Sequence, residues 1–140
     1  MQIRALISVA LLSVPTAVLA DEPTALQQIM QDLSDNLIKI SDGLLNHELE
    51  LTAKGAKAIA EHPQIPPEQV QIVAKELGPE MPVFKQFDVR VHNLAVEINA
   101  AATAGDREAA VAGFHRLVDG CLACHDAYKD RVAAALKDQQ

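Results

Sequence analysis

Apolar residues recur at spacings of three and four along most of the chain, with polar residues between them. The first such face predicts a long helix that begins at Pro23, a residue suited to a first turn, and runs to about Leu45. Its apolar positions are Leu26, Ile29, Met30, Leu33, Leu37, Ile40 and Leu44. One side of this helix is therefore expected to face a core.

A second apolar face runs from Leu49 to Ala60 and is broken by the proline-rich stretch EHPQIPP. Helix is expected to resume at about Pro67 and to stop at GPEMP after Leu77. This stretch predicts a helical segment that is interrupted by an extended connection.

A third long helix is expected from near Val83 to the sequence TAGD, where Gly105 is a helix-stop residue. Its inward positions would be Phe84, Phe87, Val91, Leu94, Ile98 and Ala101. Asp106 then provides an N-cap for the last helix, with Glu108 in the first turn. The inward face of that last helix carries Ala110, Phe114, Leu117, Val118, Cys121, Cys124, Tyr128 and Val132.

No stretch alternates apolar and polar residues in the manner of a strand. Four helical segments with short connections predict an all-α fold, an antiparallel four-helix bundle. The aromatic residues are few, namely Phe84, Phe87, Phe114 and Tyr128. A core built mainly from Leu, Val, Ile and Ala has few large side chains, which would suit a bulky prosthetic group.

Residues 1–20 have the pattern of a cleavable secretory signal: Arg4, an apolar stretch from Ala5 to Val14, and small residues before a cut after Ala20. Residues 21–140 then form one domain of ordinary size, with no stable insertion into a membrane. Arg4 is the only charge in the signal, so the 12 Lys and Arg of the chain become 11 against 19 Asp and Glu, a net charge of −8 with neutral His. Nucleic acid and anionic membranes are poor partners for such a chain.

The last helix contains Cys121, Leu122, Ala123, Cys124 and His125 within the stretch DGCLACHDAYKD. C-x-x-C-H is the attachment sequence for c-type haem, in which two thioethers anchor the porphyrin and the histidine ligates the iron. A thioredoxin-like pair usually follows a strand, and a zinc site needs a fourth ligand. A disulfide between such close cysteines would close a very small loop and stabilise the fold little. Covalent haem c, with one iron, is the favoured interpretation.

The stretch AATAGDREAAVAGFHRLVDGCLACHDAYK, with this motif on the last helix of an exported helical chain, resembles the class II c-type cytochromes, the cytochrome c prime family. The residue match extends from about Val83 to Lys129, and the similarity of architecture covers the whole mature chain. The resemblance implies a periplasmic haem protein, often a homodimer, with the haem between the helices. One departure is Lys129, where many members of the family carry an arginine.

The family divides by what meets the other face of the iron. In the low-spin branch, a methionine of the first helix is the sixth ligand and the protein is an electron carrier. In the cytochromes c prime, a bulky apolar residue blocks that face, and the five-coordinate iron binds nitric oxide or carbon monoxide. Met30 stands at the turn of the first helix where the distal residue is expected, so it is the candidate ligand; the alternative is that it only fills the core.

Other candidate ligands are Met81, expected in a connection, and His92, which could also contact a propionate. His47 and His62 fall at the ends of segments, where a solvated histidine is ordinary, and His115 is expected to point away from the ring. No set of nucleophile, base or paired carboxylates indicates an enzyme. The sequence predicts a single-electron carrier with His125 and Met30 as ligands, whose partners are redox proteins.

Overall fold

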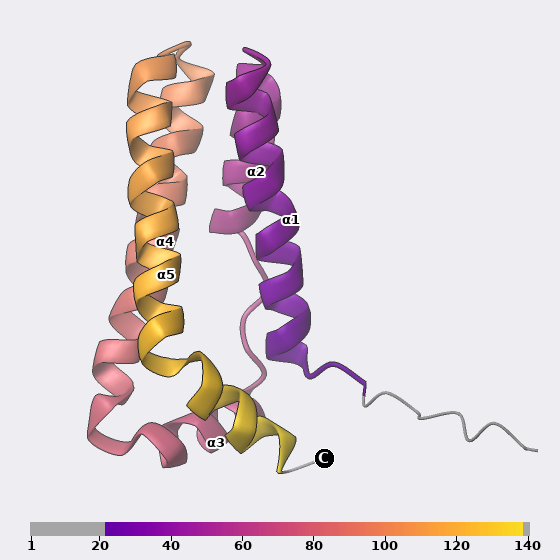
Figure 1. The fold of residues 1–140 in the computed structure, drawn as a ribbon, viewed down its shortest axis with the longest axis vertical. Helices are drawn as coiled ribbons and strands as arrows, with labels where there is room; N and C mark the ends of the chain where they lie inside the picture. Colours follow the sequence, from indigo (N-terminus) through magenta and orange to yellow (C-terminus); the bar gives the residue numbers. More distant parts are fainter. Residues whose placement is uncertain (1–21, 139–140) are drawn as a thin grey trace, which may run out of the picture.

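The computed structural model describes residues 22–138, and over that range the chain is helical, without strands. The elements are α1 (Ala25–Leu45), α2 (Leu49–Ala60), α3 (Pro67–Leu77), the 3₁₀ turn η1 (Gly78–Glu80), α4 (Met81–Thr103) and α5 (Arg107–Lys137). Helices α1, α2, α4 and α5 run side by side as an antiparallel bundle, and α3 lies across its lower end (Figure 1). The all-α, four-helix prediction is confirmed, whereas the signal and its cut lie outside the described residues.

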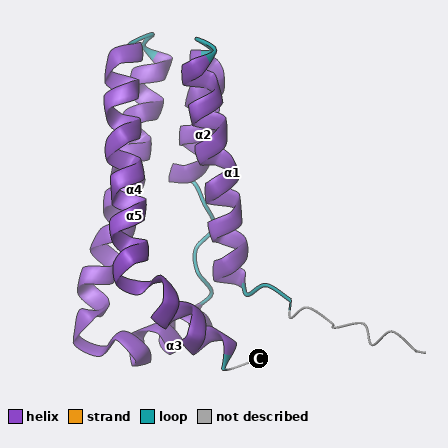
Figure 2. Cartoon of the chain, in the orientation of Figure 1, coloured by secondary structure: helices purple, strands orange, loops and turns teal. Residues whose placement is uncertain are grey.

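Figure 2 shows where the helices end and the connections begin, and the starts of α1 and α5 have side-chain caps. Thr24 caps α1 by accepting from the backbone N–H of Gln27 at 3.2 Å, and the Gln27 side chain accepts from the Thr24 N–H at 2.7 Å. The cap therefore displaces Pro23 from the first turn, where the sequence predicted it. Asp106 caps α5 through the N–H of Ala109 at 2.9 Å, and Gly105 has φ 79°, both as expected.

Met81 is the first residue of α4, whereas the sequence placed it in a connection. The turn η1 leads directly into α4, and Pro82 lies in the first helical turn, where a missing backbone N–H costs no intrahelical bond. Helix α4 therefore begins before the expected Val83. Its first residues pack against the lower part of the core.

The core has two parts, one above the other along the bundle. The upper cluster is formed by buried residues of α1, α2, α4 and α5: Ile40, Leu44, Ala56, Ile59, Leu94, Ala95, Ile98, Ala102, Ala110 and Leu117. The lower cluster joins the start of α1 to α3 and the end of α5: Leu26, Val73, Leu77, Tyr128, Val132 and Leu136. Phe84 and Phe87 of α4 pack edge-on against Tyr128, with ring centroids 5.6 and 6.0 Å away.

Buried glycines bring two pairs of helices close together. At Gly55 of α2, an added Cβ would lie 2.9 Å from the Asn36 carbonyl oxygen of α1. At Gly113 of α5, it would lie 2.7 Å from Cγ1 of Ile98 on α4. An added methyl group at either position would force neighbouring atoms to shift, so α1 packs tightly on α2 and α4 packs tightly on α5.

Within residues 22–138, no helix has the length and apolar character that a membrane crossing requires.

The contact between Gly113 and Ile98 can be tested against a matched glycine. A Cβ at Gly120, on the same side of α5, would lie at an ordinary 3.6 Å from Cγ2 of Val91. Gly113→Ala and Gly120→Ala gain the same helix propensity, so their difference isolates the steric clash. We expect Gly113→Ala to be less stable than Gly120→Ala by about 1 to 3 kcal/mol in urea unfolding. Equal stabilities would contradict the close packing of α4 on α5.

Candidate functional site

The C-x-x-C-H motif lies in the middle of α5, as the sequence predicted. Cys121 and Cys124 are free thiols and are half-buried on the inward side of the helix. Cys124 packs against the lower cluster. His125 is exposed, and its ring makes no hydrogen bond or ion pair with another described residue. Two thiols held toward the core and an uncommitted imidazole beside them form the candidate site.

Met30 of α1 lies at the same level of the bundle as this motif. Helices α1 and α5 are antiparallel and meet below the motif, where Leu26 and Tyr128 share the lower cluster. Met30 is four residues after Leu26 in α1, and Cys124 is four residues before Tyr128 in α5, whose lower end turns aside and runs across the end of the bundle (Figure 1). A second reference point is the upper contact, where Arg107 Nη2 donates to the Leu44 carbonyl at 3.2 Å. Counting equal numbers of residues down α1 from Leu44 and down α5 from Arg107 places Met30 level with Cys121.

Met30 also lies on the flank of α1 that faces α5. It follows Leu26 by one helical turn, and Leu26 belongs to the lower cluster together with residues of α5 and α3. On α5, His125 follows Cys121 by one turn, so these two residues share one flank. Met30 and the motif therefore lie across the seam between α1 and α5.

Met30 is not a core residue, contrary to its predicted place on the apolar face. It is 40% exposed, whereas Ile29 beside it is 5% exposed. At this level Ile29 is the residue of α1 that points into the core, so Met30 lies at the edge of the seam between α1 and α5. A long, flexible thioether at that edge is free to change rotamer.

The seam between α1 and α5 is the loosest in the bundle. The pairs α1 with α2, α2 with α4, and α4 with α5 approach closely along their lengths, whereas α1 and α5 do so at few positions. In Figure 1, α1 and α2 lie on one side and α4 and α5 on the other, so α1 and α5 face each other across the bundle. The candidate site thus faces the seam where the helices are held least tightly.

Helix α4 completes the site from the side opposite this seam. Val91 lies opposite Gly120, and one turn lower on each helix Phe87 lies opposite Cys124. Phe87 and Cys124 both pack against the lower cluster. Asp88, the next residue, lies close enough for its charge to act on the Cys124 thiol.

At the level of the motif, the position that α2 occupies higher in the bundle is taken by an extended segment. Helix α2 ends at Ala60, whose carbonyl oxygen lies 3.0 Å from Nδ1 of His92. Residues 61–66 then run downward without helical structure, past Asp88 (Figure 2). Pro63, Pro66 and Pro67 exclude a continuous helix here. At the level of the motif, the bundle therefore consists of three helices and one extended, non-helical segment.

Both thiols lie in surroundings that disfavour their ionised form. Burial raises the pKa of the Cys121 thiol above its ordinary value. Burial also raises the pKa of the Cys124 thiol, and the negative charges of a Cys121 thiolate and of Asp88 add to the effect. The cysteines are therefore neutral thiols at neutral pH, unlike the low-pKa thiolates of redox enzymes.

Among the other candidate ligands, Met81 packs against the lower cluster, as Cys124 does, and the histidines are exposed or engaged elsewhere. His92 is on α4 and bonds to the Ala60 carbonyl, whereas His47 and His115 are exposed. His62, expected to be solvated, is only 17% exposed because the connection folds it against Asp88. No short-range pattern in the sequence signals this contact, since the two residues are 26 positions apart.

Lys129, the departure from the family pattern, is exposed on α5. Arg131 faces α3 and η1, where its guanidinium donates to Glu76 at 3.4 Å and to Glu80 at 3.0 Å. These ion pairs tie the end of α5 to the helix that closes the lower end of the bundle.

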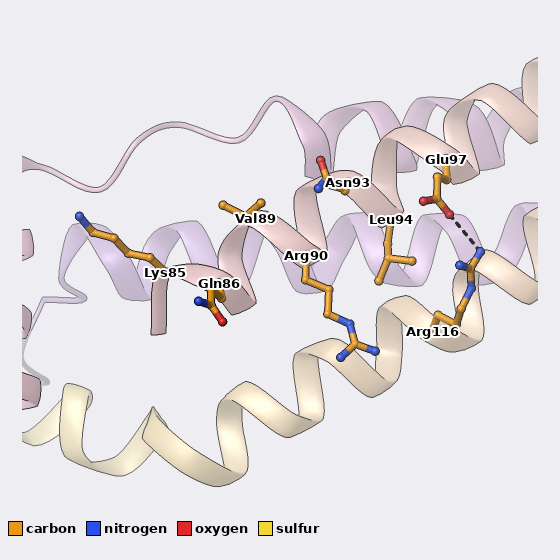
Figure 3. A pocket seen from close by; sticks show the side chains of 8 residues that line it. All are labelled: Lys85, Gln86, Val89, Arg90, Asn93, Leu94, Glu97 and Arg116. Atoms are coloured by element: carbon orange, nitrogen blue, oxygen red, sulfur yellow. Dashed lines mark hydrogen bonds and ion pairs between the residues drawn. The ribbon is translucent and has the colours of Figure 1, made fainter. Parts of the chain in front are cut away.

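A shallow surface groove lies on another side of the molecule, along α4 (Figure 3). Its lining contains three basic side chains in an otherwise acidic chain, one of which, Arg116, donates to Glu97 at 3.0 Å. The lining residues are Lys85, Gln86, Val89, Arg90, Asn93, Leu94, Glu97 and Arg116. Neither cysteine nor Met30 belongs to this groove.

Among residues 22–138, no three His, Cys, Asp or Glu side chains are gathered as ligands of a metal ion. No family model, curated protein or solved structure matches the chain.

The raised thiol pKa values can be measured by alkylation of the full chain produced without haem. A higher pKa means a smaller thiolate fraction at a given pH, so iodoacetamide should modify both cysteines more slowly in the folded chain than in urea at about pH 8. The pH–rate profile of the folded chain should also be displaced to higher pH. Mass spectrometry follows the reaction, and equal rates in the folded and unfolded chains would contradict the burial of the thiols.

Proposed function

We propose that this chain is an exported monohaem cytochrome that transfers single electrons. The observation that carries the proposal is that Met30 lies level with Cys121, Cys124 and His125 across the loosest seam of the bundle. One side thus offers two anchoring sulfurs and an imidazole, and the other offers a thioether. The proposal includes the periplasmic location and the class II resemblance, which rest on the sequence.

The residues present fit a covalently bound haem c. Cys121 and Cys124 are one helical turn apart on one side of α5 and are free to form thioethers. Their neutral thiols suit addition across a vinyl group, in which sulfur bonds to one vinyl carbon and a hydrogen ends on the other. His125 would present an imidazole nitrogen to the iron, since neither ring nitrogen is committed to another described residue.

Met30 would approach the iron from α1. Its exposed position means that ligation would need no removal of a packed core side chain. A His/Met pair raises the reduction potential of haem iron relative to harder ligands, and the bound haem would supply one-electron chemistry at that potential. The chain's own part is to anchor the ring, select the ligands and limit the access of water.

Electron transfer would occur in weak complexes with redox proteins, because a carrier must release its partner after each transfer. His125, Met30 and Leu122 are exposed, so they are accessible to such a partner. The basic groove along α4 is a separate surface.

Covalent attachment can be tested by the mass and spectrum of the chain after export in a host that matures c-type cytochromes. The wild-type chain should keep haem under denaturing conditions, because thioethers survive unfolding. Cys121→Ala combined with Cys124→Ala should lose it, while Leu122→Ala, between the two cysteines, should retain it. A wild-type chain of unmodified polypeptide mass would sink the proposal.

Ligation by Met30 can be tested with carbon monoxide on the dithionite-reduced protein. We expect little spectral change in the wild type and a fast, complete change in Met30→Ala, because the substitution opens the sixth position. Met81→Ala serves as a matched methionine control and should behave as wild type. Rapid, complete binding by the wild type would favour the five-coordinate, gas-binding alternative.

A further inference from the structure

The groove along α4 is a surface feature that the proposed function does not use. It has a volume of about 470 Å³ and is lined by one flank of α4 together with Arg116 of α5. From Lys85 to Glu97 it follows about 18 Å of helix. Neither cysteine, nor His125, nor Met30 belongs to its lining, so its chemistry is independent of a bound haem.

The lining is positive in a chain that is negative overall. The formal net charge of the chain is −7, whereas three basic side chains line the groove against a single carboxylate, that of Glu97. This carboxylate accepts from Arg116 at 3.0 Å, so it neutralises only one of the three cations. Because the other acidic residues of the surface repel an anion, an anionic group is attracted most strongly to this groove.

Lys85 and Arg90 have no partner among the described residues. Neither makes a hydrogen bond or an ion pair there, and the Arg90 side chain extends from α4 across the groove toward α5 (Figure 3). The other arginines of residues 22–138, namely Arg107, Arg116 and Arg131, all donate to acceptors of the chain. A ligand carboxylate at Arg90 would therefore break no contact within the described chain.

Apolar side chains lie among these charges. Val89 lines the groove and is 55% exposed, and the buried Leu94 also belongs to the lining. Val96, two turns above Val89 on the same side of α4, is exposed as well. A single exposed valine is ordinary on a protein surface, but exposed valines between unpaired cations suit a ligand that presents both carboxylates and an apolar group.

We propose that this groove binds an acidic segment of a partner protein. Carboxylates of the segment would contact Lys85, Arg90 and Arg116, and an apolar side chain between them would cover Val89. A guanidinium donates two parallel hydrogen bonds to one carboxylate, so Arg90 is expected to contribute most to the affinity.

The extent of the groove favours a polypeptide over a small anion. Its basic groups are distributed from Lys85 at one end to Arg116, beside Glu97, at the other, farther apart than the two charges of a small dicarboxylate. An extended chain covers about 3.3 Å per residue, so a segment of about six residues spans the groove. A small ligand would instead need an enclosed pocket that buries most of its surface. A nucleic acid would be repelled by the acidic remainder of the chain.

Binding can be measured by fluorescence anisotropy, with the full chain and a labelled synthetic peptide of about ten residues in which glutamates surround a central leucine. The peptide should bind at low ionic strength and be released by added salt, because salt screens exposed charges. The same peptide with glutamine in place of glutamate should not bind. An acidic peptide that fails to bind at low ionic strength overturns the proposal.

Variants that remove one charge locate the binding site. Arg90→Gln and Lys85→Gln should each weaken peptide binding about threefold or more, and Arg90→Lys, which keeps the charge, should weaken it less than Arg90→Gln. Lys75→Gln is the matched control, since it removes the same charge from an exposed position on α3 outside the groove. Equal losses in Lys75→Gln and Arg90→Gln would mean that only the net charge matters, and the groove would not be the site.

The apolar part of the site has its own pair of variants. Val89→Ser should weaken binding, whereas Ile38→Ser, a change of an exposed apolar residue on α1, should not. Wild-type affinity in Val89→Ser would contradict the apolar contact. Because all of these side chains are exposed, urea unfolding of each variant should match the wild type, which separates loss of binding from loss of the fold.

Two other occupants are tested with the same protein. A single-stranded DNA oligonucleotide should not compete with the peptide, and displacement of the peptide at equal concentration would show a general polyanion site and overturn the proposal. Sedimentation of the wild-type chain should show no association that Arg90→Gln abolishes. Such an association would make a second copy of this acidic chain the occupant in place of a separate partner. None of these measurements requires haem, so their outcome is distinct from that of the proposed function.

Discussion

Close contact at buried glycines is the constraint on which the rest of this structure depends. Gly55 lets α1 approach the backbone of α2, and Gly113 lets α5 approach Ile98 of α4. Helix α4 also packs closely on α2, where His92 reaches the Ala60 carbonyl. Three of the four seams between helices are therefore closely packed, and the seam between α1 and α5 is loosely packed. The motif on α5 and Met30 on α1 both face that seam.

The early end of α2 changes how the core is built at the level of the motif. Prolines stop this helix at Ala60, one to two turns above the level of Cys124. An extended chain has a smaller cross-section than a helix, so the core at this level depends on Phe84, Phe87 and Tyr128 instead. The same extended segment carries His62 to Asp88 of α4.

The sequence was sufficient for the helices and for the motif, because both depend on local information. Periodicity located α1, α2, α4 and α5, and the capping roles of Asp106 and Gly105 were also predictable. Met30 was placed on the apolar face because spacing cannot fix the rotation of a helix to within one residue, and the core turns through Ile29. The pair of His62 and Asp88 depends on how an irregular connection folds, which no periodic pattern encodes.

The central claim is that a ligand from α1 meets an iron held on α5. The most direct measurement is the absorption spectrum of the exported protein in both redox states, inspected for the charge-transfer band between methionine sulfur and ferric iron. The account predicts that this band is present in the oxidised protein, that the reduced protein is low-spin, and that Met30→Ala lacks the band. A high-spin spectrum without the band in the wild type would contradict it.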